Sequence, residues 1–176
     1  MIVNKAFYFI RHGKTDWNLN KASTQQTDIP LNNRGIQQAQ KASLLFKHIT
    51  LTAVISSPLL RAKQTAETLS SFLGLPLSFN NGLQERNFGS AMEQCNEIII
   101  GPESEPKFEK RVIFTLNSIL ESEELPLIVS HGDVLSVISR VLLHENISPD
   151  NCVPYLFIPP TQENPRWTLS TLVENI

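Results

Sequence analysis

The chain has 176 residues, 15 basic and 17 acidic side chains, and a formal net charge of −2 at neutral pH. This length predicts a single domain, 1–176, that buries a substantial core. The near-balanced charge argues against a nucleic-acid partner or an acidic membrane surface, and no apolar run approaches the ~20 residues of a membrane helix. We therefore expect a cytoplasmic protein with neither a nucleic-acid nor a membrane partner.

Short apolar runs rich in β-branched and aromatic residues predict strands at 6–10, 53–56, 127–130, 155–158 and 167–173. Apolar residues at helical spacing predict helices between them, at 36–49, 59–73, 108–120 and 134–143. Strands that alternate with helices favour a three-layer α/β/α sandwich with a mainly parallel central sheet. The segment 80–106 shows little of either period, which is typical of a flap, and we place a short cap insertion at about 86–107.

Cys95 and Cys152 are the only cysteines, and neither belongs to a CxxC pair or to a cluster with histidines. This pattern predicts reduced thiols and gives no indication of a zinc site. We expect neither a bound metal nor a cofactor.

Three polar residues stand close behind the ends of three predicted strands. His12 follows the first strand, Arg61 follows the second near the start of a helix, and His131 follows the strand at 127–130. Ligands gather beyond the carboxyl ends of parallel strands, so we expect these side chains to converge. Beside His12, Arg11 offers a charged planar fork for phosphate oxygens, and Gly13 lets the backbone approach a ligand. The pattern favours a phosphate-binding site around a nucleophilic imidazole.

Ordered motifs along the chain carry a family resemblance: Arg11-His12-Gly13-Lys14-Thr15-Asp16-Trp17-Asn18, Ser56–Glu67, Leu83-Gln84-Glu85-Arg86-Asn87-Phe88-Gly89 and Ser130-His131-Gly132. From residue 7 to about 140, the chain resembles the phosphoglycerate-mutase-like branch of the histidine phosphatase superfamily. The resemblance implies a metal-independent phosphomonoesterase that forms a phosphohistidine. It also implies that the substrate is a small phosphorylated metabolite, or a phosphorylated protein.

The resemblance also implies a role for each matching residue. His12 is the expected nucleophile, and Glu85 is the expected acid and base, serving first the leaving group and then water. The residues expected to bind the transferring phosphoryl group are Arg11, Arg61, His131 and Asn18. The residues expected to contact other parts of the substrate are Thr24, Arg86 and Gly132.

Two departures from the family pattern limit what the resemblance implies. Lys14 stands where relatives usually have Glu, and Ala22 and Gln25 replace an Arg and a Gly, so anion contacts from that loop are not carried over. After Gly89, where small phosphatases of the family often have Trp-Glu-Gly, the chain reads Ser-Ala-Met-Glu, so Glu93 receives no role.

Two alternatives stay open. The segment 83–89 also resembles that of a phosphoglycerate mutase, but only a short stretch separates Gly89 from Phe108, and a mutase needs a lid that excludes water. The second alternative is an inactive relative that binds phosphorylated ligands, which retention of the motif residues disfavours. The sequence predicts neither the physiological substrate nor the oligomeric state.

Overall fold

A computed structural model describes residues 2–16, 28–88 and 102–172. The described part contains one six-stranded sheet in the order β3-β2-β4-β1-β5-β6. The strands are β1 (Phe7–Arg11), β2 (Val54–Ser56), β3 (Leu77–Phe79), β4 (Leu127–Ser130), β5 (Pro154–Ile158) and β6 (Thr168–Thr171). The helices are α2 (Asn33–Leu45), α3 (Leu60–Leu73), α4 (Glu105–Ser122) and α5 (Gly132–Leu143), with a short 3₁₀ turn, η1 (Asn81–Leu83).

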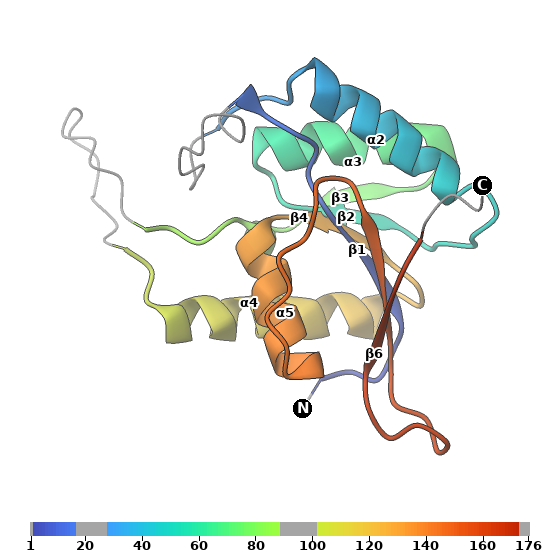
Figure 1. The fold of residues 1–176 in the computed structure, drawn as a ribbon, viewed down its shortest axis with the longest axis vertical. Coiled ribbons are helices and arrows are strands. Elements are labelled where there is room, and N and C mark those ends of the chain that lie inside the picture. Colours follow the sequence, from blue (N-terminus) through green and yellow to red (C-terminus); the bar gives the residue numbers. More distant parts are fainter. Residues whose placement is uncertain (1, 17–27, 89–101, 173–176) are drawn as a thin grey trace.

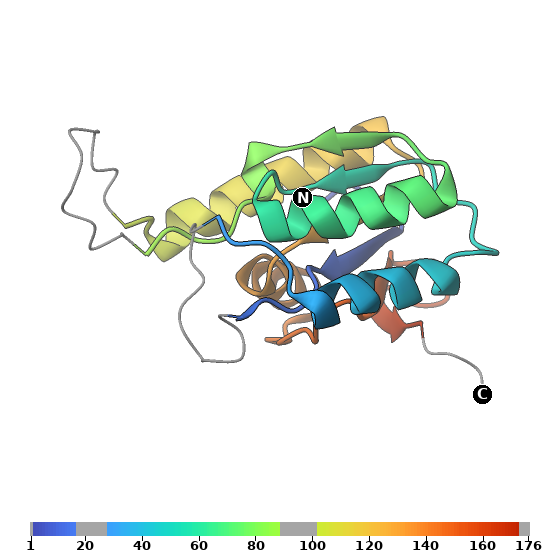
Figure 2. The same ribbon diagram turned by 90° about the horizontal axis from the view of Figure 1, so that it is seen from above.

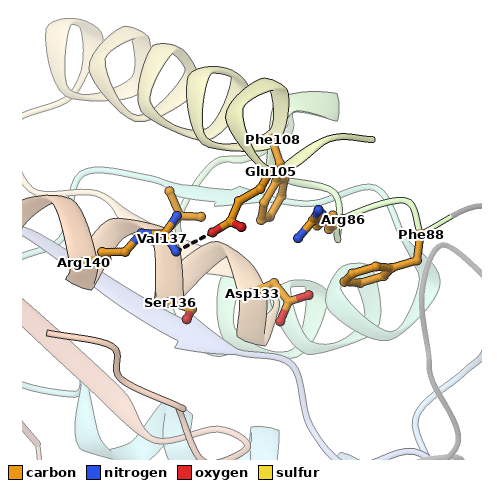
Figure 3. Close-up of a pocket in the computed structure, with 8 residues that line it drawn as sticks. All are labelled: Arg86, Phe88, Glu105, Phe108, Asp133, Ser136, Val137 and Arg140. Atoms are coloured by element: carbon orange, nitrogen blue, oxygen red, sulfur yellow. Dashed lines mark hydrogen bonds and ion pairs between the residues drawn. The ribbon is translucent and has the colours of Figure 1, made fainter. Parts of the chain in front are cut away.

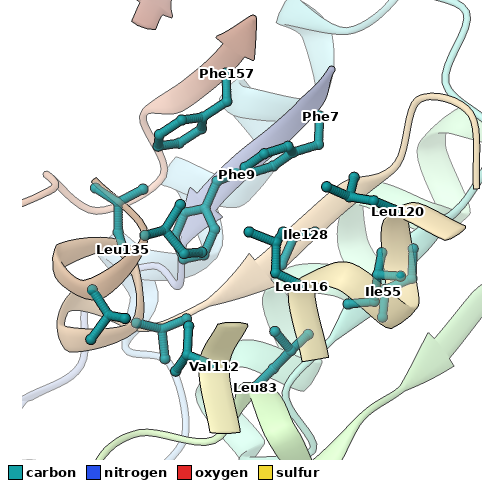
Figure 4. Close-up of a cluster of buried hydrophobic side chains, with 14 of the residues drawn as sticks. Phe7, Phe9, Ile55, Leu83, Val112, Leu116, Leu120, Ile128, Leu135 and Phe157 are labelled. Atoms are coloured by element: carbon teal, nitrogen blue, oxygen red, sulfur yellow. The ribbon is translucent and has the colours of Figure 1, made fainter. Parts of the chain in front are cut away.

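The sheet is the middle of three layers, as the sequence predicts (Figure 1, Figure 2). Alternate side chains of β1 point to opposite faces, because the period of a strand is two. Phe7 and Phe9 pack in the core formed with α4 and α5 (Figure 4). Tyr8 and Ile10 pack in the core formed with α2 and α3. The strand that carries the nucleophile candidate at its end is therefore buried on both faces.

The four strands β3, β2, β4 and β1 run parallel, so their carboxyl ends meet at one edge. Backbone bonds continue past the strands: the His12 amide donates to Ser130 O at 3.0 Å, and the Ser57 amide donates to Val129 O at 3.0 Å. The predicted mainly parallel sheet is confirmed. In the described sheet β5 runs antiparallel to both of its neighbours, β1 and β6, and the periodicity of the sequence did not predict the direction of β5 or β6.

The observed elements differ from the predicted ones at several boundaries. The strand β3 was not predicted, because it has three residues and mostly exposed side chains, Phe79 among them. The helix α2 begins at Asn33 rather than at residue 36, since the side chain of Asn32 caps it by accepting from Gly35 N at 2.9 Å. It ends at Leu45, before the predicted end at residue 49. The helix α4 begins at Glu105, so the end of the expected cap segment belongs to a helix.

Two glycines let the chain after His12 lie directly against the first turn of α2. A Cβ atom on Gly13 would lie 2.5 Å from the carbonyl oxygen of Gly35, and a Cβ on Gly35 would overlap the carbonyl oxygen of Lys14. Backbone atoms are on both sides of this contact, so no flexible side chain can move to make room. The approach fixes the path of the chain that carries His12.

We predict that Gly35→Ala lowers the free energy of unfolding by about 1–3 kcal/mol, since it forces overpacked backbone apart. The same displacement should lower kcat, because it moves the segment beside His12. Urea unfolding and steady-state kinetics measure the two effects. Gly74→Ala is the control: its φ is +66° and no atom lies within 4 Å of the added Cβ, so it should cost stability through backbone strain alone and leave kcat unchanged. A Gly35→Ala enzyme with wild-type kcat would contradict the prediction.

Candidate active site

The predicted convergence occurs at the carboxyl edge of the sheet. Arg11 ends β1 and His12 follows it, Arg61 lies in the first turn of α3, and His131 precedes α5. The side chains of His12, Arg61 and His131 are buried. The rings of His12 and His131 have centroids 5.3 Å apart, and Arg61 Nε donates to His12 Nε2 at 3.2 Å. Three segments far apart in the sequence thus form one buried group.

The hydrogen bonds of His12 define its tautomer. His12 Nδ1 lies 2.8 Å from Gly13 O, and a carbonyl oxygen only accepts, so Nδ1 carries the proton. In the neutral ring Nε2 then holds a lone pair, which accepts the bond from Arg61. Burial first and the positive charge of Arg61 second lower the pKa of His12 to about 3. The imidazole is therefore neutral at physiological pH, with Nε2 unprotonated.

Residues on other elements hold His12 in this orientation. Asn151 Nδ2 donates to His12 O at 2.7 Å, and Gly13 N donates to Thr65 Oγ1 at 3.1 Å. The hydroxyl of Thr65 in turn donates to Arg61 O at 2.8 Å, which links the loop after β1 to α3. Sequence reasoning assigned no role to Thr65 or Asn151. Thr65 lies inside a motif that carried the resemblance, whereas Asn151 has no local signal.

Two buried polar atoms beside His12 have no hydrogen-bond partner among the described residues, Arg11 Nε and His131 Nδ1. The rest of each side chain is held: Arg11 Nη1 donates to Pro149 O at 3.0 Å, and His131 Nε2 lies 2.8 Å from Ser57 Oγ. Burial first and Arg61 second lower the pKa of His131 well below its usual value. Buried polar atoms are nearly always paired, and a guanidinium N–H is a strong donor to anionic oxygens, so these two nitrogens are the candidate contacts for an anion at this edge.

Glu85 is buried at the same edge. Burial first and the negative charge of Asp133 second raise its pKa to about 7, against the opposing effect of Arg61. Its Oε1 accepts from the Arg86 amide at 3.3 Å. At neutral pH a substantial fraction of Glu85 carries a proton, so the carboxyl group can donate one.

Arg86 lines a cavity of about 180 Å³ next to this group (Figure 3). The guanidinium of Arg86 lies 4.8 Å above the ring of Phe88, and its Nε donates to Glu103 O at 3.1 Å. Asp133 lies on the α5 side of the cavity. Arg86, which the resemblance predicts to be a substrate contact, thus lines a cavity together with aromatic and acidic side chains.

Of the remaining predicted substrate contacts, the structure describes one, Gly132, and does not describe the other two. Gly132 lies beside Arg11, and a Cβ on it would be 3.7 Å from Arg11 Cζ, an ordinary contact that does not by itself require glycine. Asn18 and Thr24 lie outside the described residues.

Within residues 2–16, 28–88 and 102–172, no group of three or more His, Cys, Asp or Glu side chains is arranged to hold a metal ion. Among the helices described, none combines the length and the apolar character needed to cross a membrane.

Comparisons with known proteins identify the family of this chain. A family model described as the histidine phosphatase superfamily (branch 1) matches residues 7–153. The chain is 31% identical over 158 residues to a probable phosphoglycerate mutase GpmB of Salmonella paratyphi A, which spans 77% of this chain and 74% of that protein. It is 41% identical over 86 residues to an uncharacterized phosphatase PhoE of Bacillus subtilis, a match that spans 49% of this chain and 45% of PhoE.

Among solved structures, a putative alpha-ribazole-5'-P phosphatase from Escherichia coli has a TM-score of 0.78 at 26% identity, and the match covers 97% of this chain and 96% of that one. The chain belongs to the histidine phosphatase superfamily, branch 1, and the resemblance carried by its motifs is confirmed. It is a phosphatase enzyme by class.

The raised pKa of Glu85 predicts that Glu85→Gln stabilises the protein, and more at pH 8 than at pH 5. Above its ordinary value of 4.5 the unfolded chain ionises this group while the folded protein keeps the proton up to about 7, so native stability falls as pH rises through that window. An amide removes this pH-dependent loss. Thermal unfolding at both pH values measures it.

Glu103→Gln is a control of opposite sign, because a hydrogen bond from Arg111 lowers the pKa of Glu103. That substitution should destabilise the protein at pH 8. A melting temperature of Glu85→Gln below wild type at pH 8 would show that burial is not the main influence on Glu85.

Proposed function

We propose that the protein is a phosphomonoesterase that hydrolyses phosphate esters through a phosphohistidine on His12. The observation that carries this proposal is that a neutral histidine and a partly protonated glutamate lie at the same buried edge of the sheet. His12 is neutral, with an Nε2 lone pair that accepts from Arg61 and has to exchange this bond for the attack on phosphorus, while a substantial fraction of Glu85 holds a proton near neutral pH. These are the states that a nucleophile and a general acid need.

The proposed reaction has two steps. In the first, His12 Nε2 attacks phosphorus, the bond from phosphorus to the ester oxygen breaks, and Glu85 gives its proton to that oxygen. In the second, the Glu85 carboxylate takes a proton from water, the water oxygen attacks phosphorus, and the bond from phosphorus to Nε2 breaks. Phosphate leaves and both groups return to their starting states.

The phosphoryl group carries negative charge on its equatorial oxygens, and catalysis of its transfer depends on donors that are already in place. We assign this role to Arg11, Arg61 and His131, since Arg11 Nε and His131 Nδ1 are buried at this edge and have no partner within the described residues. We retain Asn18 as a further donor. Because the two guanidiniums supply positive charge, we propose that turnover needs no added metal.

We propose that the leaving group lies toward Arg86 and the cavity that it lines, with Thr24 and Gly132 as further contacts. The cavity combines two guanidiniums, two aromatic rings and two carboxylates, which suits a small polar phosphorylated metabolite. A phosphorylated side chain of a protein stays the alternative substrate. We retain the cytoplasm as the proposed location.

The phosphoglycerate mutase alternative is supported by the similarity to GpmB. Hydrolysis is favoured by the short segment between Gly89 and Phe108, and by the similarity to PhoE and to the alpha-ribazole-5'-P phosphatase structure. The inactive-relative alternative is disfavoured, because an inactive protein has no need to keep His12 neutral and Glu85 protonated.

We expect Glu85→Gln to lower kcat/KM for an alkyl phosphate by about 10²–10⁴, the usual contribution of a general acid. The loss with p-nitrophenyl phosphate should be much smaller, because that leaving group needs little protonation. His12→Ala is the reference and should abolish turnover of both substrates. Steady-state kinetics with the two esters measures the difference. Equal losses for Glu85→Gln on both substrates would remove Glu85 from the acid role.

We expect phosphomonoesters to release phosphate in the presence of a metal chelator. In contrast, 3-phosphoglycerate with a catalytic amount of 2,3-bisphosphoglycerate should yield little 2-phosphoglycerate, because a mutase has to keep water from its phosphohistidine. Phosphate release and isomerisation are measured in the same reaction. Isomerisation much faster than phosphate release would establish the mutase instead.

A further inference from the structure

Arg111 lies on α4, outside every motif that predicted the site, yet all three nitrogens of its guanidinium donate hydrogen bonds. Nη1 donates to the carbonyl oxygens of Gly82 and Gln84, each at 3.0 Å. Nε and Nη2 donate to the two carboxylate oxygens of Glu103 at 2.8 and 2.6 Å. The guanidinium also lies 4.9 Å above the ring of Phe108 on the same helix. Such a two-pronged pairing with a carboxylate fixes orientation as well as distance.

The backbone held by Arg111 is the segment that leads directly into Glu85. Between the two carbonyls that Arg111 binds, Leu83 O accepts from Ser130 Oγ at 2.7 Å. Three consecutive carbonyls before Glu85 are therefore bound, two by α4 and one by the end of β4. Ser130 immediately precedes His131, so these bonds connect the acid candidate to the phosphate-binding edge.

Glu103 ties the chain after Glu85 to the same arginine. The Glu103 amide donates to Asn87 O at 2.6 Å, and Arg86 Nε donates to Glu103 O at 3.1 Å. The side chain of Glu103 meanwhile pairs with Arg111. Arg111 thus holds the backbone on both sides of Glu85, directly on one side and through Glu103 on the other.

The position of Glu85 matters because its protonation depends on burial. The charged groups that face it are Arg61 from α3, Arg11 from β1 and Asp133 from α5. The two arginines and the hydrogen bond from the Arg86 amide favour the ionised form, whereas burial and Asp133 favour the protonated form. A shift of the Glu85 backbone toward water would hydrate the carboxyl group. The arginines would then favour its ionised form, and the pKa of Glu85 would fall.

We propose that Arg111 is a positioning residue for the acid and base Glu85: its fork binds the backbone before Glu85 directly and the backbone after it through Glu103, and so keeps the carboxyl group buried at the leaving-group oxygen. The proposal rests on the phosphomonoesterase function proposed above. Arg111 itself does not touch the substrate, so its effect passes through Glu85.

The test is Arg111→Lys, which retains a positive charge and removes the fork. We expect kcat/KM for an alkyl phosphate to fall about tenfold or more, with a clearly smaller loss for p-nitrophenyl phosphate, because misplacement of a catalytic group affects the step that needs it. We also expect the alkaline limb of the alkyl-phosphate pH profile to move to lower pH by about one unit, as the pKa of a partly hydrated Glu85 falls part of the way toward its ordinary value. Equal losses on both substrates, or an unmoved alkaline limb, would overturn the proposal.

Lys5→Met is the matched control. Lys5 also binds a backbone carbonyl and a carboxylate at α4, donating to Glu123 O at 3.3 Å and to Glu124 Oε1 at 2.9 Å, but at the opposite end of the helix. Its removal tests a general loss of packing around α4. Lys5→Met should leave unchanged both the pH profile and the ratio of kcat/KM for the alkyl phosphate to kcat/KM for p-nitrophenyl phosphate. A shift of the alkaline limb equal to that of Arg111→Lys would overturn the proposal.

Two further variants keep the outcomes separable. Should thermal unfolding show that Arg111→Lys does not fold, Glu103→Gln is the deciding variant. It weakens the pairing of Arg111 with Glu103 and keeps the bonds of Arg111 to the two carbonyl oxygens. It should move the alkaline limb to lower pH by a smaller amount, and an unmoved limb would overturn the proposal. Glu85→Gln, measured in parallel, reports on the function itself. Equal losses for Glu85→Gln on both esters refute the acid role of Glu85, whereas a selective loss there without one in Arg111→Lys refutes only the role of Arg111.

Discussion

Exclusion of water from the carboxyl edge of the sheet is the constraint on which the rest of the site depends. Burial favours the neutral form of every ionisable group. The same exclusion therefore lowers the pKa of His12 to about 3 and raises that of Glu85 to about 7. Burial therefore favours both neutral His12 and protonated Glu85, which are the forms that the proposed phosphoryl transfer needs.

Such an edge lowers stability, because it collects a buried guanidinium, a carboxyl group and polar atoms without partners. The two cores that enclose the sheet offset this cost. Phe7 stacks on Phe157 with ring centroids 4.7 Å apart, and on the other face Tyr8 meets Phe46 edge to face at 5.2 Å. Because β1 takes part in both cores and ends at Arg11, the strand that supports the site is itself firmly packed. Rigid support of this kind suits a group of residues whose mutual positions decide the chemistry.

Prediction from sequence succeeded where the signal is local. The run before His12 is apolar and aromatic, so its strand and the placement of the imidazole at the strand end followed from the chain itself. The convergence of His12, Arg61 and His131 then followed from the general behaviour of parallel sheets. Prediction failed at β3, whose side chains are mostly exposed and whose length is too short to show a period, and it gave no direction for the last two strands. The position of Glu85 came from a motif alone, since a single carboxylate in a loop has no periodic signal.

The amino-acid sequence by itself determined the fold class, the family and the identity of the residues at the candidate site, because period-two and helical patterns and contiguous motifs are properties of neighbours along the chain. Only the tertiary structure decided the state of those residues. The proton on His12 Nδ1, the surroundings of Arg11 and His131, and the two-sided hold of Arg111 around Glu85 depend on which segments the sheet order brings together. The bond from Asn151 to His12, for example, joins residues 139 positions apart. Burial and hydrogen bonding over such separations are set by packing, and packing exists only once the whole chain has folded.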